Sequence, residues 1–132
     1  MTPAVRIRPA TDGDMAYIYE TWLEGQRGEF PDMRDSDYYP WQRARIGQLL
    51  ATGAVLNVAS PEEAQSVIWA WLCWSRMAVH YLYVRPAHRK TGLATQMLAG
   101  FDLAKPLRIT ALSPDARAIK RAHPDLLRYV PL

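Results

Sequence analysis

Apolar and polar residues alternate along some segments of the chain and recur at helical spacing along others. Val5 and Ile7 alternate with arginines, which is the period of a half-buried strand, whereas apolar residues from Met15 to Leu23 recur at three- and four-residue steps. Thr11 precedes this helical pattern as a candidate N-cap. In chain order, the pattern predicts a strand over 5–10, a helix over 12–24, a long loop over 25–40, a helix over 41–50, strands over 54–59, 66–74 and 78–84, a helix over 91–104, a strand over 107–112, a helix that begins at Ser113 and ends before Pro124, and an edge strand over 128–131.

The order of these elements indicates the fold class. Three successive strands form an antiparallel meander, and the later strands alternate with helices as in a βαβ crossover. The sequence therefore predicts an α/β fold of the α+β sandwich kind, with about six strands and about four helices. With 132 residues, of which 49% are hydrophobic, we expect one domain spanning residues 1–132.

Several classes of protein are disfavoured by the composition. No apolar run reaches the length of a membrane span, and the first residues lack the pattern of a secretory signal, so we expect a cytoplasmic protein without membrane association. Cys73 is the only cysteine, which excludes an internal disulfide framework and a cysteine-based zinc site.

Charge is distributed unevenly. Residues 1–37 hold eight acidic side chains and four arginines, a net charge of −4. The remaining residues hold twelve basic and five acidic side chains, a net charge of +7, so the whole chain has a net charge of +3. The basic residues form no dense block and gather near a glycine-containing turn. A small phosphorylated ligand is therefore a better expectation than nucleic acid, which we retain only as a less favoured alternative.

The segment 81–98 carries the clearest chemistry. A strand that ends at Val84 is followed by a turn with Arg89 and Gly92 and then by a helix. Free backbone N–H groups at a helix start bind anions, and a glycine lets a phosphate approach the backbone. Basic and hydroxyl side chains surround this turn and would add charge and hydrogen bonds: Arg89, Lys90, Thr91 and Thr95. Neither the three-glycine dinucleotide pattern nor the P-loop pattern is present.

The same segment resembles the signature of the GNAT (GCN5-related) N-acetyltransferase family. The matching residues of VRPAHRKTGLA are Val84, Pro86, Arg89, Gly92 and Ala94, and the order of elements matches over nearly the whole chain. The resemblance implies a splayed mixed sheet in which strand 78–84 parts from strand 107–112 to hold the pantetheine arm of acetyl-CoA (coenzyme A). It further implies that the cofactor contacts backbone groups of Leu82, Tyr83 and Val84 and the pyrophosphate-binding turn formed by Arg89, Lys90, Thr91, Gly92, Leu93, Ala94 and Thr95.

Two residues are candidates for the catalytic acid and base. His80 lies on strand 78–84 at the same side-chain parity as Leu82 and Val84, and similar enzymes carry a proton-relaying side chain on this strand; the alternative is a histidine packed on the sheet. Many family members have a tyrosine acid in the last helix, but Ala122 occupies that position here. Tyr129 is our candidate acid, with His123 as an alternative and with structural roles open for both.

Acidic and aromatic residues gather in the first helix and the following loop, the segments that flank the acceptor cleft in similar folds. Carboxylates beside aromatic rings suit a cationic amine such as a polyamine, a lysine side chain or an aminoglycoside. We name as substrate-binding candidates Glu20, Glu24, Tyr38 and Tyr39, with Glu29 among the further acids of this region. Ordinary core and surface roles are the alternative for each of them.

These observations lead to one main hypothesis and one alternative. The main hypothesis is an acetyl-CoA-dependent N-acetyltransferase that acylates a primary amine, on a small molecule or a protein, by direct attack in a ternary complex without a metal. The alternative is a catalytically weak or inactive GNAT-fold module that acts through protein contacts, motivated by the missing tyrosine. The tryptophans of strand 66–74 leave a homodimer open.

Overall fold

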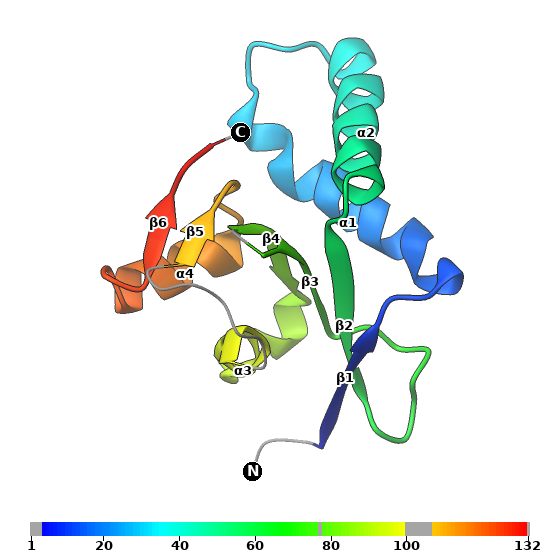
Figure 1. Cartoon of the computed structure of the whole chain (residues 1–132), viewed down its shortest axis with the longest axis vertical. Helices are drawn as coiled ribbons and strands as arrows, with labels where there is room; N and C mark the ends of the chain where they lie inside the picture. Colours follow the sequence, from blue (N-terminus) through cyan, green and yellow to red (C-terminus); the bar gives the residue numbers. More distant parts are fainter. Residues whose placement is uncertain (1–3, 77, 100–106, 132) are drawn as a thin grey trace.

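The computed structural model describes residues 4–76, 78–99 and 107–131, which form one six-stranded sheet with helices on both faces (Figure 1). The strands are β1 (Val5–Pro9), β2 (Val55–Pro61), β3 (Ala70–Ser75), β4 (Ala78–Val84), β5 (Leu107–Ile109) and β6 (Leu127–Tyr129). The helices are α1 (Met15–Gln26), α2 (Asp35–Ala51), α3 (Leu93–Ala99) and α4 (Pro114–Ala122), with short 3₁₀ turns η1 (Asp12–Asp14), η2 (Arg27–Glu29) and η3 (Pro86–His88). The end of the predicted helix 91–104, with Phe101, lies outside the described residues.

The strands follow one another across the sheet in chain order. β1 to β4 are antiparallel neighbours, whereas β5 pairs parallel to β4 and β6 parallel to β5. The predicted meander, the helical crossovers and the predicted edge strand are confirmed. The fold class predicted from the sequence is therefore confirmed as well.

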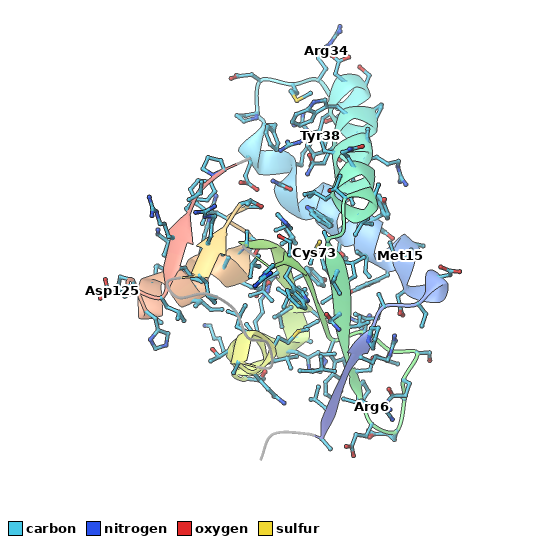
Figure 2. All side chains as sticks on the ribbon, viewed as in Figure 1. Arg6, Met15, Arg34, Tyr38, Cys73 and Asp125 are labelled. Carbon is cyan, nitrogen blue, oxygen red and sulfur yellow. The ribbon has the colours of Figure 1, made fainter. Side chains whose placement is uncertain are left out.

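Two apolar clusters pack on opposite faces of the sheet. One joins α3 and α4 to the sheet through residues such as Leu93, Met97 and Ile119, and the other joins α1 and α2 through Trp22 and Ile46. Burying such side chains stabilises each layer by ~1.5–3 kcal/mol per large residue. Cys73 belongs to the second cluster and lies in the middle of the molecule (Figure 2).

Local capping signals position several helix ends as predicted. The Asp14 carboxylate accepts a hydrogen bond from the Thr11 backbone N–H at 2.7 Å, and the Ser113 hydroxyl accepts one from Ala116 N–H at 3.1 Å. The helix that follows ends at Ala122, two residues before Pro124. Such caps stabilise a helix end by about 1 kcal/mol because they satisfy otherwise free backbone donors.

The start of α2 differs from the prediction. We expected a loop up to Pro40, but the helix begins at Asp35 and contains Pro40. Asp35 and Asp37 lie in its first turn, where negative charge is favourable. Tyr38 is fully buried and its hydroxyl donates to Leu23 O at 2.7 Å (Figure 2), so tertiary packing against α1 holds this turn helical in spite of the proline.

Among the described residues, no helix has both the length and the apolar character needed to cross a bilayer.

Candidate active site

The sheet opens between β4 and β5. These strands pair only at Val79 and Ile109, and one further hydrogen bond runs from Thr110 N–H to Val79 O at 3.0 Å. Beyond this point the two strands diverge, and the remaining length of β4 faces an opening. The predicted splay between strands 78–84 and 107–112 is present.

Backbone groups along β4 point alternately to β3 and to the opening. Arg85 N–H donates to Trp69 O at 2.8 Å, which makes this a hydrogen-bonded pair of the β3–β4 ladder. Hydrogen-bonded and non-hydrogen-bonded pairs alternate in antiparallel sheets. The backbone N–H and C=O of Tyr83 therefore also point to β3, whereas those of Leu82 and Val84 point to the opening. The expectation for Tyr83 is corrected accordingly: its backbone is used by β3, and Leu82 and Val84 remain as partners for a ligand strand.

The turn between β4 and α3 has the conformation of an anion-binding turn. Lys90 has φ of 64° and Gly92 has φ of 82°, so two residues on either side of Thr91 adopt the left-handed region before α3 begins. Thr91 donates its hydroxyl to His88 O at 2.6 Å, and the His88 ring stacks on Trp69 with centroids 4.3 Å apart. These contacts fix the turn from within.

A hollow of about 330 Å³ lies between this turn and α4. Most of the predicted cofactor residues line it, namely Val84, Arg89, Lys90, Gly92, Leu93, Ala94 and Thr95. Leu82 is buried in the core, and Thr91 is not among the lining residues. Arg121 of α4 and His123, directly after that helix, complete the far wall.

Asp115 is a wall residue of this hollow that sequence reasoning did not identify. Its carboxylate accepts a hydrogen bond from Val84 N–H at 2.9 Å and lies 3.2 Å from Arg89 Nε, which also donates to Val84 O. Burial raises the pKa of Asp115, although the Val84 N–H and the charge of Arg89 act in the opposite direction. Only its place in the first turn of a Ser-Pro-capped helix could have drawn attention to it.

His80 lies on the other side of the sheet from the one we expected. Cys73 pairs with Tyr81 and Trp74 with Val79, so His80 is the extra residue of a β-bulge. The bulge turns the His80 side chain away from the face that Leu82 and Val84 share, so the predicted parity is wrong. His80 instead lines a cavity of about 20 Å³ with residues of α1 and α2.

Both ring nitrogens of His80 are hydrogen-bonded. Nδ1 lies 3.2 Å from the Thr110 hydroxyl and Nε2 lies 3.0 Å from the Ser75 hydroxyl. Burial lowers the pKa of His80, which favours the neutral ring. Each of these hydroxyls could carry a proton to or from the ring.

Tyr129 lies at the end of the sheet, where the charge of Glu29 acts on it. Tyr129 ends β6 and is 37% exposed, and Val130 N–H donates to Ile109 O at 2.8 Å. Burial and the negative charge of Glu29 raise the pKa of Tyr129, whereas Arg117 lowers it. Figure 1 shows the end of β6 running toward the turn that follows α1.

The remaining acceptor candidates are separated from this place. Glu20, Glu24 and Tyr39 line an open hollow of about 600 Å³ beside α1 and α2, which shares no lining residue with the hollow at the β4–α3 turn. Tyr38 is completely buried, so the expectation of a substrate contact for it is corrected to a packing role. Within the described parts of the chain, no three His, Cys, Asp or Glu side chains gather as metal ligands.

Comparisons with known proteins support the same fold. No family model matches the sequence, and no curated protein matches it. An acetyltransferase of the GNAT family from Staphylococcus aureus Mu50 is 19% identical with a TM-score of 0.52, and the match covers 74% of this chain and 63% of that one. The chain thus spans less than two thirds of the length of that protein.

Two further solved structures match over more of their length. A predicted acetyltransferase from Clostridium acetobutylicum, solved with acetyl-CoA, is 15% identical with a TM-score of 0.58 over 91% of this chain and 88% of that one. A GCN5-related N-acetyltransferase from Rhodopseudomonas palustris is 20% identical with a TM-score of 0.52 over 92% of this chain and 80% of that one. The chain has the GNAT N-acetyltransferase fold.

Proposed function

We propose that this protein is an acetyl-CoA-dependent N-acetyltransferase that transfers the acetyl group to a primary amine by direct attack in a ternary complex. The observation that carries the proposal is the combination of the β4–β5 opening with the hollow at the β4–α3 turn. In this fold, a ligand with a pyrophosphate and a long amide-containing arm would fill both at once.

The residues around the hollow fit coenzyme A. Gly92 leaves its Cβ direction open, since nothing lies within 4 Å of that position, and it lines the hollow together with the residues that begin α3. Arg89, Lys90 and Arg121 supply positive charge, against the single carboxylate of Asp115. Leu82 and Val84 would pair with the arm, so Asp115 would release Val84 N–H when the arm enters.

The thioester of the bound cofactor supplies the activated acyl group, and the protein supplies position and proton transfer. A neutral amine must attack, so a base must first take a proton from the ammonium form. His80 is a candidate that would act through the Ser75 or Thr110 hydroxyl, and Tyr129 is the candidate that returns a proton to the leaving thiolate. A cationic acceptor agrees with the acidic balance of residues 1–37.

A second candidate function is a GNAT-fold binding module without turnover. Two observations favour it: Ala122 stands where the tyrosine acid occurs in many family members, and Asp115 already holds the Val84 N–H. The two functions differ in whether coenzyme A is released in an amine-dependent manner.

The test is thiol release from acetyl-CoA by the purified chain, with spermidine, an Nα-blocked lysine and kanamycin as trial amines. An amine-dependent release of free thiol, with the acetylated amine identified by mass spectrometry, supports the enzyme. Binding of acetyl-CoA without release for any amine supports the module. No binding of acetyl-CoA by the folded protein contradicts the enzyme and leaves a module that acts through protein contacts.

A further inference from the structure

Glu29 has an uncommon environment for a carboxylate. Its Oε1 accepts a long hydrogen bond of 3.4 Å from Leu112 N–H, while Oε2 is buried and makes no hydrogen bond to the described residues. No ion pair of Glu29 is found within the described ranges either. A buried carboxylate oxygen without a donor is costly, and such groups in native structures commonly have a functional explanation.

Glu29 lies at the β4–β5 opening. It ends η2, directly after α1, and α1 contacts β4 there because the Tyr81 hydroxyl packs against Gly25 so closely that no Cβ would fit. On the other strand, Leu112 follows two residues after Thr110, whose backbone N–H donates to Val79 O of β4. The segment from Gly25 to Glu29 therefore spans the opening from β4 to the end of β5.

The groups that face Glu29 leave its negative charge without a close partner. Burial raises the pKa of Glu29, and the Leu112 N–H, the charges of Arg117 on α4 and Arg45 on α2, and the Gln26 amide lower it in part. The negative charge of Glu29 helps to raise the pKa of three phenols on α2, β4 and β6, namely Tyr38, Tyr81 and Tyr129. Tyr38 and Tyr81 are buried, so Tyr129, which is 37% exposed, is the phenol that could contact an alkylammonium group bound at Glu29.

We infer that Glu29, rather than His80, binds the ammonium group of the acceptor and takes the proton that must leave before attack. This inference rests on the proposed acetyltransferase function and names the residue that handles the acceptor. His80 is less suited, because its ring is buried and both its nitrogens are already hydrogen-bonded.

The proton and bond changes balance as follows. The ammonium gives one proton to Glu29, and the neutral amine nitrogen then forms a bond to the thioester carbonyl carbon. The carbon–sulfur bond breaks and the thiolate leaves; the second proton of the attacking nitrogen goes to that thiolate, directly or through Tyr129, to give free coenzyme A thiol. Glu29 afterwards releases its proton to solvent, so the products are the acetamide, the thiol and one proton.

The variants that test this inference are Glu29→Gln, His80→Gln and Glu63→Gln. Glu63 is an exposed glutamate between β2 and β3 and serves as the matched control. We expect Glu29→Gln to lower kcat/KM for the amine by about 100-fold or more and to remove the acidic limb of its pH profile, because a glutamine cannot take a proton. We expect Glu29→Gln to leave acetyl-CoA affinity within about twofold, since the residue does not line the cofactor hollow.

The expected results for the other variants separate a base from a structural residue. His80→Gln should keep the acidic limb even where it lowers the rate, and Glu63→Gln should match the wild type. Wild-type kcat/KM and an unchanged limb in Glu29→Gln would overturn the inference while leaving the proposed function standing. The inference would also be overturned if the acidic limb of the pH profile were lost in His80→Gln and kept in Glu29→Gln.

A binding measurement tests Glu29 independently of turnover. Titration of the full chain with spermidine or the blocked lysine, in the presence of coenzyme A, should show at least a tenfold weaker affinity for Glu29→Gln than for Glu63→Gln. Equal affinities overturn the assignment. Failure of the wild type to bind acetyl-CoA would instead contradict the proposed function on which the inference rests.

Discussion

At the scale of single residues, three carboxylates have different environments and different consequences. Asp14 is surrounded by donors, and Asp115 accepts from Val84 N–H beside the cofactor hollow. One oxygen of Glu29 has only the long hydrogen bond from Leu112 N–H, and the other is buried without a hydrogen bond to the described residues. The contact of Asp14 has a local signal, because its partner Thr11, the predicted N-cap, lies three residues away. The sequence could not single out Glu29, whose partner Leu112 is 83 residues away. Contacts over that distance follow from the fold and leave no local signal.

Asp14 should make stability depend on pH. The Arg8 guanidinium, bonded at 2.7 Å, together with the Thr11 donors lowers the pKa of Asp14 to about 2. Since the pKa in the folded state is lower than in the unfolded chain, the ionised group stabilises the fold above pH ~4, and this contribution is lost as the pH falls toward 2. Asp14→Asn should lower the free energy of unfolding at pH 7 by about 1–2 kcal/mol, measured by urea denaturation.

The matched control for Asp14 is Asp12→Asn, an exposed acid of the same turn, which should change stability by less than ~0.5 kcal/mol. The Asp14→Asn and wild-type curves should converge at the acid end of the series. A difference that stayed constant from pH 7 to pH 2 would show that charge is not the origin of the effect.

Asp115 should oppose the cofactor. Its carboxylate lines the hollow in which the pyrophosphate would lie and occupies the Val84 N–H. Asp115→Asn removes the negative charge and keeps an oxygen that can accept the Val84 hydrogen bond. Acetyl-CoA should therefore bind about three- to tenfold more tightly to the variant, by isothermal titration at neutral pH. Weaker binding would mean that the carboxylate supports the site rather than competing for it.

At the scale of elements, local patterns determined most of the secondary structure. The alternation of Val5 and Ile7 and the Ser113 cap depend on neighbours in the sequence, so β1 and α4 were predicted closely. The start of α2 and the bulge at His80 depend on partners far along the chain, α1 in one case and β3 in the other. Both were missed because residue type and spacing carry no record of such pairing.

Pro40 should destabilise α2. It lies in the second turn of a helix that begins at Asp35, where a proline removes one backbone hydrogen bond and crowds the preceding turn. Pro40→Ala should raise the free energy of unfolding by about 1–2 kcal/mol, after allowance for the greater freedom it gives the unfolded chain. Urea denaturation measures the change.

Pro31→Ala, in the loop before α2, provides the control, since that proline lies outside any helix and its replacement should give no gain. A loss of stability in Pro40→Ala would indicate that the proline fits the bent start of the helix and that its rigidity stabilises the fold.

At the scale of the whole molecule, the order of strands and helices together with the signature at 84–94 was enough to predict the fold. The meander, the opening between β4 and β5 and the turn before α3 all lie where the sequence placed them. The acceptor region was less predictable, because Glu20, Glu24 and Tyr39 lie beside α1 and α2 in a hollow of their own while Glu29 reaches the opening. The docking of a helix on the sheet decides which acidic residue of that helix, or of the loop after it, faces a site.

The central claim is that the β4–α3 turn binds the pyrophosphate of acetyl-CoA. Isothermal titration of the wild type, Gly92→Glu and Gly53→Glu tests it most directly. Both glycines have positive φ and open space at the Cβ position, so both variants place a side chain in the left-handed region and add the same charge. Gly53 lies between α2 and β2, away from the turn. We predict micromolar binding for the wild type and Gly53→Glu, with a loss of at least 30-fold, about 2 kcal/mol, for Gly92→Glu. Equal binding by all three folded proteins, or none by the wild type, would contradict the claim.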